Sequence, residues 1–325
     1  MLARIAQELF WLGRDLTRAE YTARMVDGVY HAHLQERSDD PGAVLLSWDA
    51  LVAIVGADPT RPGHEDVVRM LTVDAGSPGS VVSCIRRGRE RARTLRGVIS
   101  SEMWEAVNTV HLDLGESDVR AALDIGPYGL FHYVKERSAL FWGIVERTML
   151  RDEAHCFLQA GGRIEAADMV LRVLRVALPP EADEAEARRD GERERAGSLD
   201  GEADALLHTL GGFQAYRRVS LEAPDAAPVA RFLLFEPGYP GSVAFSIEAL
   251  ERALHDADAD SRTSRPGLRL GRLMAELASR RHGAPLEGDV VSALSAVQEQ
   301  LALVDREIDA RYFAGAEGAT LAPQP

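Results

Sequence analysis

The sequence has few of the features that place a protein outside the ordinary soluble classes. It contains two cysteines, Cys84 and Cys156, which lie far apart in the chain. This argues against a disulfide framework and is typical of buried thiols in a reducing compartment. No stretch approaches the roughly 18 apolar residues of a membrane-spanning helix, and residues 1–15 lack the uninterrupted apolar core of a signal peptide. We therefore expect a soluble, cytoplasmic protein.

The chain also lacks an excess of positive charge. The formal net charge is -14, with 37 basic against 51 acidic side chains. Because nucleic-acid binding requires an excess of positive charge to meet the phosphate backbone, we do not expect this class of function. No Gly-rich phosphate loop of the Walker type is present, so any ATP chemistry would belong to a partner. Asp152 and His155 have the spacing of a metal-binding pair, but no further carboxylates lie in register, and we expect no metal or other cofactor.

The sequence is rich in helical periodicity. Apolar residues recur at three- and four-residue steps from Ile5 to Tyr30, which predicts a helix over residues 2–34. The one serious strand candidate, residues 229–235, also suits a helix, because Pro228 can occupy a first helical turn. Further helices are predicted over residues 48–55, 65–71, 81–113, 130–178 (as one helix, with a kink at 160–162, or as two), 203–221, 227–235, 243–254, 268–282 and 288–312.

This pattern predicts an all-α fold. We expect a single helical-bundle domain over residues 1–313. Residues 179–204 are dense in charge and almost devoid of large apolar side chains, so they predict a solvated, mobile insertion. Residues 314–325 have the composition of a disordered tail.

Two segments of the chain resemble each other. WLGRDLTRAEYTARMV and QAGGRIEAADMVLRVL align with Gly13 opposite Gly161 and with Arg24 opposite Arg172. The alignment indicates a degenerate duplication of a helical unit. Chance similarity between helical sequences is the alternative.

The first predicted helix places arginines among apolar side chains. At about 100° per residue, Arg14 falls on one side of the helix with Phe10 and Tyr21. Arg18 lies at the margin of that side. A helix that is apolar on two sides is packed by neighbours on both, so these guanidinium groups would face another helix or a cleft. There they need a partner, either a carboxylate of the same chain in a structural ion pair or an anionic group of a ligand.

A second arginine-rich segment lies at residues 83–108. On a continuous helix, Glu90 would lie about one turn from both Arg86 and Arg93 and would orient them. Because guanidinium groups bind carboxylate and phosphate bidentately, we predict an anion-binding face that meets the first arginine row in a shared groove. A solvated helix with surface ion pairs is the alternative. The predicted row is Arg86, Glu90, Arg93, Gly97, Ser101, Trp104 and Asn108, whereas Arg87 and Arg91 lie off it.

These arginine-bearing segments resemble one known family. MLARIAQELFWLGRDLTRAEYTARMVD, RRGRERARTLRGVISSEMWEAVN and ERTMLRDEAHCFLQAGGRIEAADMVLRVL are similar to the alpha-E domain family, an all-helical bacterial domain of unknown function. The resemblance covers residues 1–313. It implies a helical fold and a setting beside, or fused to, a circularly permuted ATP-grasp protein. That setting implies a role in synthesising, ligating or processing a peptide.

The chain departs from the family pattern at several positions. The first motif of the family usually reads Glu-Arg, where this chain has Thr17 and Arg18. The second copy retains Glu165 but has Ala166 in the place of the arginine. A catalytic role that needs a complete Glu-Arg pair is therefore in question for this chain. Glycines stand at two further positions where the family commonly has arginine, Gly162 and Gly241.

Three hypotheses about function follow. The leading one is a helical accessory protein of an ATP-grasp-linked peptide system, whose arginine-rich groove binds an acidic peptide, a phosphate-bearing ligand or the partner, without nucleic acid or membrane. The alternative is an enzyme that forms or cleaves amide bonds with Glu90 or Glu102 as general base. A purely structural scaffold is the third. The predicted ligand-binding residues are Arg14, Arg18, Arg86, Arg93, Ser101, Trp104 and Asn108.

Overall fold

Helices make up the regular structure of the chain. The computed structural model describes residues 1–36, 48–55, 64–126, 128–177, 196–220, 224–282 and 290–315. Every regular element within these ranges is helical, which confirms the predicted all-α fold. The strand candidate at residues 229–235 belongs to helix α12. Residues 179–195 of the predicted insertion and residues 316–325 of the predicted tail lie outside the described residues.

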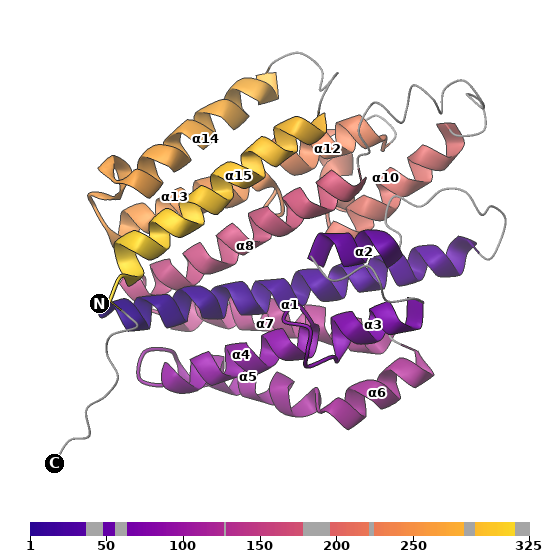
Figure 1. Cartoon of the computed structure of the whole chain (residues 1–325), viewed down its shortest axis with the longest axis horizontal. Coiled ribbons are helices and arrows are strands. Elements are labelled where there is room, and N and C mark those ends of the chain that lie inside the picture. The colour runs from indigo at the N-terminus through magenta and orange to yellow at the C-terminus, as the bar shows by residue number, and fades with distance from the viewer. Residues whose placement is uncertain are drawn as a thin grey trace.

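The helices form two groups, and each group contributes one helix to a central pair. The first group consists of α1 (Ala3–Glu36), α2 (Trp48–Val55), α3 (His64–Thr72), α4 (Val81–Thr94), α5 (Ser101–Asp113), α6 (Glu116–Ile125) and α7 (Tyr128–Thr148). The second consists of α8 (Glu153–Ala177), α10 (Ala196–Leu210), α11 (Phe213–Val219), α12 (Ala226–Phe235), α13 (Val243–Ala257), α14 (Arg265–His282) and α15 (Val290–Ile308), with short turns at Ser261–Thr263 and Asp309–Phe313. Figure 1 shows α3 to α7 on one side of the central helices α1 and α8, and α12 to α15 on the other.

Some helix boundaries differ from those that the sequence predicts. The helix predicted over residues 81–113 is two helices, because the Ser100 hydroxyl caps α5 by accepting from the Met103 amide at 3.2 Å. Residues 130–178 form two helices, which was one of the two predicted alternatives, but the break lies between Thr148 and Glu153 and not at residues 160–162. Helix α10 begins at Ala196, before the start of the helix predicted over residues 203–221.

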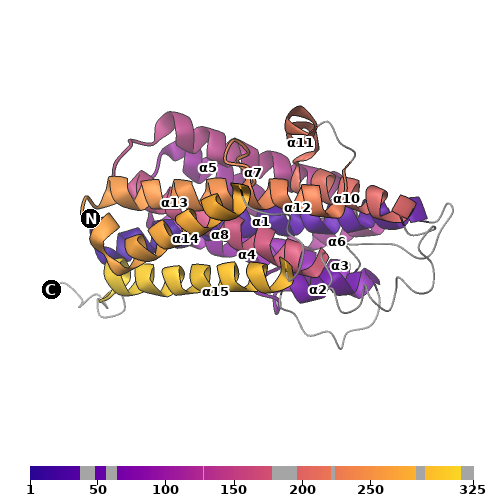
Figure 2. The same ribbon diagram turned by 90° about the horizontal axis from the view of Figure 1, so that it is seen from above.

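The central helices α1 and α8 run side by side in the same direction (Figures 1 and 2). Their backbones touch where each helix carries glycine. A Cβ atom on Gly161 would lie 1.8 Å from the Phe10 carbonyl oxygen, and one on Gly13 would lie 2.3 Å from the Leu158 carbonyl oxygen. Only glycine permits this approach, because any side chain would meet the backbone of the other helix. Gly13 and Gly161 therefore set the contact between the two helices, and the segment at residues 160–162 does not produce a kink.

The structure supports an internal duplication. Helix α8 repeats α1, and each carries an ion pair one turn apart at the aligned positions, Arg24 to Glu20 at 2.8 Å and Arg172 to Asp168 at 2.7 Å. Figures 1 and 2 show the two helices at the centre of the molecule, with helices of both halves around them. The bundle is thus built from two related helical units.

A second pair of matching segments, which the sequence analysis missed, makes the case for duplication stronger. Residues 74–85, DAGSPGSVVSCI, match residues 236–247, EPGYPGSVAFSI, and the two segments lead into α4 and α13. Four hydrogen bonds in the two turns form two matching pairs. They are Ser80 Oγ to Asp74 O (2.9 Å) and Ser242 Oγ to Glu236 O (2.6 Å), Ser83 N to Ser80 Oγ (3.2 Å) and Phe245 N to Ser242 Oγ (3.1 Å).

The glycine contact makes a stability prediction. Gly161→Ala should lower the free energy of unfolding by about 1–3 kcal/mol or more, because α1 and α8 must separate to admit one methyl group. The measurement is urea denaturation followed by circular dichroism.

Gly143→Ala is the matched control. Gly143 lies within α7, and a Cβ atom there would meet nothing within 4 Å. This substitution should leave stability unchanged or raise it by up to about 1 kcal/mol, because alanine is the better helix former. Equal effects at the two positions would contradict the proposed role of Gly161.

Candidate functional site

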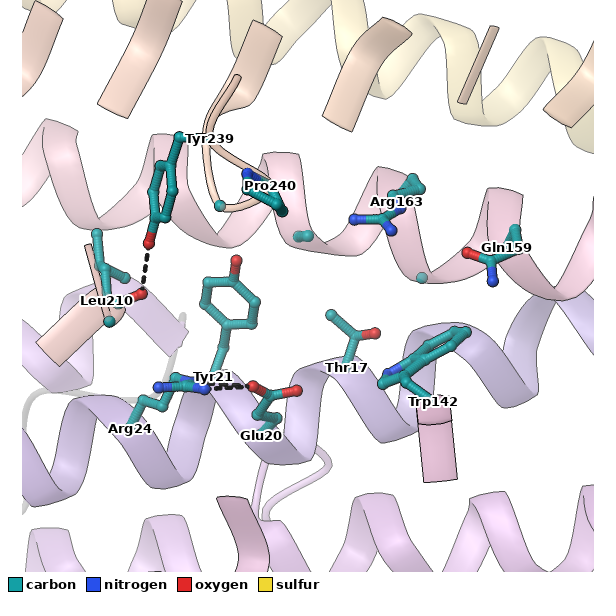
Figure 3. Close-up of a pocket in the computed structure, with 14 residues that line it drawn as sticks. Thr17, Glu20, Tyr21, Arg24, Trp142, Gln159, Arg163, Leu210, Tyr239 and Pro240 are labelled. Atoms are coloured by element: carbon teal, nitrogen blue, oxygen red, sulfur yellow. Dashed lines mark hydrogen bonds and ion pairs between the residues drawn. The ribbon is translucent and has the colours of Figure 1, made fainter. Parts of the chain in front are cut away.

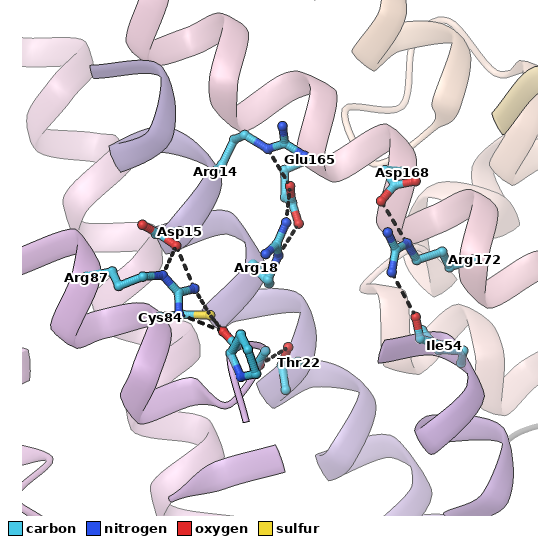
Figure 4. A network of polar contacts seen from close by, with 12 residues as sticks. Arg14, Asp15, Arg18, Thr22, Ile54, Cys84, Arg87, Glu165, Asp168 and Arg172 are labelled. Carbon is cyan, nitrogen blue, oxygen red and sulfur yellow. Dashed lines mark hydrogen bonds and ion pairs between the residues drawn. The ribbon is translucent and has the colours of Figure 1, made fainter. Parts of the chain in front are cut away.

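A buried cluster of charged side chains joins α1 to α8 (Figure 4). The Glu165 side chain is fully buried, and its carboxylate accepts from Arg14 Nε at 2.9 Å and from Arg18 Nε at 2.5 Å. Arg14 Nη1 also donates to Asp305 of α15 at 2.8 Å. Carboxylates of the same chain thus satisfy both arginines, as in the structural ion-pair alternative.

The charges in this cluster stabilise one another. Burial opposes ionisation of Glu165, but the Arg18 and Arg14 guanidinium groups outweigh it and hold the pKa of Glu165 below its ordinary value. Burial also opposes the charge of Arg14, and the Glu165 and Asp305 carboxylates outweigh it and raise the pKa of Arg14. These groups are therefore ionised at neutral pH, and they fill the space between the two helices.

A second buried carboxylate, Asp15, joins α1 to α4. It accepts from Arg87 Nε at 2.9 Å and from Arg91 Nε at 3.0 Å. These two arginines lie off the predicted row, yet they are the ones that point inward. The sequence carries a signal for this, because small residues at one-turn spacing, Gly88 and Ala92, mark the side of α4 that approaches α1.

The predicted second row does not form. Because α4 ends at Thr94 and α5 begins at Ser101, the later members of the row lie on a helix that folds back along α4. Arg86 and Arg93 are exposed, whereas Arg14 and Glu165 are buried. The two arginine rows therefore do not meet in a shared groove, and that prediction is wrong.

The contacts of the second segment also differ from those predicted. Glu90 accepts from Arg89 at 2.5 Å and from Arg93 at 3.0 Å, and no ion pair joins it to Arg86 in the described residues. Arg89 donates to Asn108 at 3.2 Å and lies 5.5 Å from the centre of the Trp104 ring. This is an ion-paired surface, as in the solvated-helix alternative. Anion binding by Arg86, Arg93, Ser101, Trp104 and Asn108 stays a prediction for this surface.

The two candidate general bases lie on the same surface. Glu90 and Glu102 are both exposed. The hydrogen bond from Arg89 is the largest of the effects that lower the pKa of Glu90, which makes this carboxylate a weaker base. Neither glutamate lines the cavity between α1 and α8. Their surroundings thus lack the desolvated pocket in which enzymes usually place a carboxylate base.

A cavity of about 340 Å³ opens between α1 and α8, beside the charged cluster (Figure 3). Helix α7 and the turns after α10 and before α13 complete its walls. Its side chains include aromatic rings, hydroxyl groups and charges of both signs. The lining residues are Thr17, Glu20, Tyr21 and Arg24 of α1, Trp142 of α7, Gln159, Gly162, Arg163 and Ala166 of α8, and Leu210, Gly211, Tyr239, Pro240 and Gly241 of the two turns.

The duplication explains why this cavity is open. When the halves are aligned on Gly13 and Gly161, the cavity lies at the positions that correspond to the charged cluster. A smaller, uncharged residue replaces each charged side chain that joins α1 to α8 in the cluster. The replacements are Thr17 for Glu165, Gly162 for Arg14, and Ala166 for Arg18.

Arg163 is a cation at this cavity that has no counter-ion among the described residues. It lines the cavity and has no ion pair or hydrogen bond with any residue that the structure describes. Burial lowers the pKa of Arg163, and Tyr21 and Glu146 only partly offset this effect. The Phe245 ring packs against it, with the ring centre 5.2 Å from the guanidinium carbon. Arginine keeps its charge in proteins, so a positive charge faces the cavity.

Comparison with the other half shows that the charge at this position is reversed. The counterpart of Arg163 is Asp15, which has two arginine partners. The second matching segment places Ala249 and Ala253 at the positions of those partners, Arg87 and Arg91. The second half thus carries a cation where the first carries an anion, and the side chains that would be its neighbours are apolar.

The remaining polar groups of the cavity are hydrogen-bonding groups of low reactivity. Tyr239 donates to the Leu210 carbonyl oxygen at 2.9 Å, and the Tyr21 hydroxyl points into the cavity (Figure 3). Burial raises the pKa of Tyr21 and raises that of Tyr239 to about 12, so both phenols are protonated at neutral pH. Helical periodicity did not indicate this site. The alignment of the two halves could have indicated it, because small residues in one half correspond to charged residues in the other.

The structure also bears on metal binding and on membrane spanning. Within the described ranges, no group of three or more His, Cys, Asp or Glu side chains is placed to hold a metal ion. In the same ranges, no helix combines the length and the apolar character that crossing a bilayer demands.

Comparison with known proteins supports the family resemblance. The Alpha-E family model, described as a predicted alpha-helical domain with a conserved ER motif, matches residues 1–313. Uncharacterized proteins of Mycobacterium bovis and Mycobacterium tuberculosis are each 27% identical over 316 residues, which cover 89% of this chain and 33% of theirs. The chain therefore spans about a third of the length of these relatives. No solved structure matches the chain.

The buried cluster makes a prediction about stability. Glu165→Ala should lower the free energy of unfolding by about 3–5 kcal/mol, because Arg14 and Arg18 would lose a shared buried counter-ion. Denaturant unfolding measures this change. Glu90→Ala removes an exposed glutamate that also lies between two arginines, and it should leave stability nearly unchanged. A smaller loss for Glu165→Ala than for Glu90→Ala would rule out the proposed role of the cluster.

The same cluster predicts a pH dependence. The folded pKa of Glu165 lies below its ordinary value of 4.5, so its charge stabilises the fold fully above that pH. The stabilisation is lost as the pH falls through the folded pKa. The difference in unfolding free energy between the wild type and Glu165→Gln should therefore be constant near neutral pH and shrink in acid. Unfolding curves at a series of pH values test this, and a difference that grows in acid would contradict it.

Proposed function

The chain belongs to the Alpha-E family, and from that premise we propose that it is a binding module whose cavity between α1 and α8 holds a small anionic ligand. The observation that carries the proposal is Arg163, a cation at the cavity wall with no counter-ion among the described residues. Arg163 is half-buried, so its charge is partly desolvated, and a ligand anion would make a charge-assisted hydrogen bond with it.

The form of the cavity supports this proposal. Its volume, about 340 Å³, lies at the lower end of the range of about 300–1,000 Å³ that is usual for small-molecule sites. The rings of Trp142, Tyr21 and Tyr239 give it apolar surface, and a few polar groups converge on it. Arg24 is paired with Glu20, so Arg163 is the charge that is open to an anion.

The resemblance to the family supplies the setting that we propose. The module would serve a cytoplasmic system for peptide synthesis, ligation or processing that depends on a circularly permuted ATP-grasp protein. In this system the partner would carry out the ATP chemistry, and the helical module would bind the anionic substrate or product. The exposed arginines of α4, Arg86 and Arg93, would then be available to the partner protein.

The enzyme alternative, amide-bond formation or cleavage with Glu90 or Glu102 as general base, has less support. Both glutamates are exposed, and neither lines the cavity between α1 and α8. The cavity itself contains Glu20 as its carboxylate, and this group is already paired with Arg24 at 2.8 Å. A binding role therefore agrees better with the geometry than a catalytic one.

Removal of the unpaired cation tests the binding proposal. Isothermal titration of the purified chain with inorganic phosphate and with acetate at low salt should show saturable binding. Arg163→Ala should weaken this binding by about tenfold or more, because it deletes a charge-assisted contact.

Arg86→Ala is the matched control for this experiment. It removes an exposed arginine that has no ion pair among the described residues, and it should leave binding unchanged. Binding that survives Arg163→Ala and is lost in Arg86→Ala would move the site to the surface of α4. Absence of saturable binding by either anion would end the proposal.

A further inference from the structure

A second charged group of the cavity has an atom without a hydrogen-bond partner among the described residues. This group is the Glu20 carboxylate, whose charge is opposite to that of Arg163. Glu20 accepts from Arg24 through a single carboxylate oxygen, Oε1, at 2.8 Å. Its other oxygen, Oε2, has no hydrogen-bond donor among the residues that the structure describes. Figure 3 shows this oxygen pointing away from Arg24, toward Thr17 and the interior of the cavity.

The other half of the molecule shows how such a carboxylate is normally satisfied. The counterpart of the Glu20–Arg24 pair is Asp168–Arg172. There, one oxygen of Asp168 accepts from Arg172 at 2.7 Å and the other accepts from the Gln298 side chain at 3.0 Å. Asp168 thus has donors on both oxygens, whereas Glu20 has a donor on one. A ligand group could supply the missing donor at Glu20.

The two unmet groups lie on different walls of the cavity. Glu20 belongs to α1, and Arg163 belongs to α8. In Figure 3 both side chains border the same space, with the Thr17 hydroxyl between the two helices. A ligand that satisfies both groups must carry an anion and, at another point, a cationic or neutral hydrogen-bond donor.

We propose that the cavity binds a zwitterion of the amino-acid type, either a free α-amino acid or a short peptide. Its carboxylate would pair with Arg163, and its ammonium group would donate to Glu20 Oε2. This inference rests on the proposed function, because it assigns a chemical class to the ligand of the same cavity. The aromatic rings of Trp142 and Tyr21 would contact its apolar part.

The charges of the cavity disfavour the other common anionic ligands. A nucleotide or another polyphosphate carries several negative charges and would need several cations. Among the residues that the structure describes, the cavity offers Arg163 as its one guanidinium group without a counter-ion, and the carboxylate of Glu20 lies on the opposite helix. That carboxylate would repel a polyanion but attract an ammonium group. A simple monocarboxylate would satisfy Arg163 and leave Glu20 unmet.

A binding screen with matched analogues tests this inference. The full chain is titrated with the 20 common L-amino acids and with dialanine, and the best binder is compared with its N-acetyl derivative and with its amide. Both analogues should bind about tenfold more weakly than the parent, because each lacks one of the two charges. In Glu20→Gln the discrimination against the N-acetyl derivative should disappear.

Asp168→Asn is the matched control, because it removes the counterpart carboxylate and leaves the cavity lining intact. This variant should keep the full discrimination. An N-acetyl derivative that binds as well as its parent would overturn the inference. So would binding of acetate or phosphate without binding of any amino acid or dialanine, and in that case the proposed anion site would stand. If no anion of any kind binds, the proposed function fails as well.

Discussion

The fold depends on the contact between α1 and α8, where two parallel helices touch backbone to backbone at glycine and share one buried carboxylate. Gly13 and Gly161 permit the approach, and Glu165 then lies between Arg14 and Arg18. A fully buried carboxylate is tolerated only with such partners, since desolvation alone would neutralise it. The two halves of the bundle meet at this contact, because each half contributes one of the two helices (Figure 1).

Because of the duplication, the charged cluster and the cavity occupy equivalent positions in the two halves, and the difference between them points to function. In the cluster, three charged side chains close the space between the central helices. At the cavity, Thr17, Gly162 and Ala166 leave it open, and Arg163, which has no counter-ion among the described residues, faces it. The description of the family speaks of a Glu-Arg motif. In this chain the two incomplete copies complement each other in space, since Arg18 of the first pairs with Glu165 of the second.

Much of the fold could be predicted from the sequence, whereas the cavity could not. Periodicity predicted the first helix and the helix over residues 48–55 well, because burial of one apolar face determines both. It failed at residues 95–100, which are individually compatible with helix. There α4 has ended, and the Ser100 hydroxyl caps the start of α5. Because the helix was assumed to continue across that break, Arg86 and Asn108 were predicted to lie in one row. The arginines that point inward, Arg87 and Arg91, lie off that row, and periodicity within α4 does not indicate their partner Asp15, which lies on α1.

We propose that an anion binds beside Arg163, and bromide can locate this site directly. A crystal of the protein soaked in sodium bromide would reveal bound anions by their anomalous scattering. We expect a strong peak in the cavity between α1 and α8, next to the Arg163 guanidinium group. Peaks confined to exposed arginines such as Arg86 and Arg93, with none beside Arg163, would contradict it.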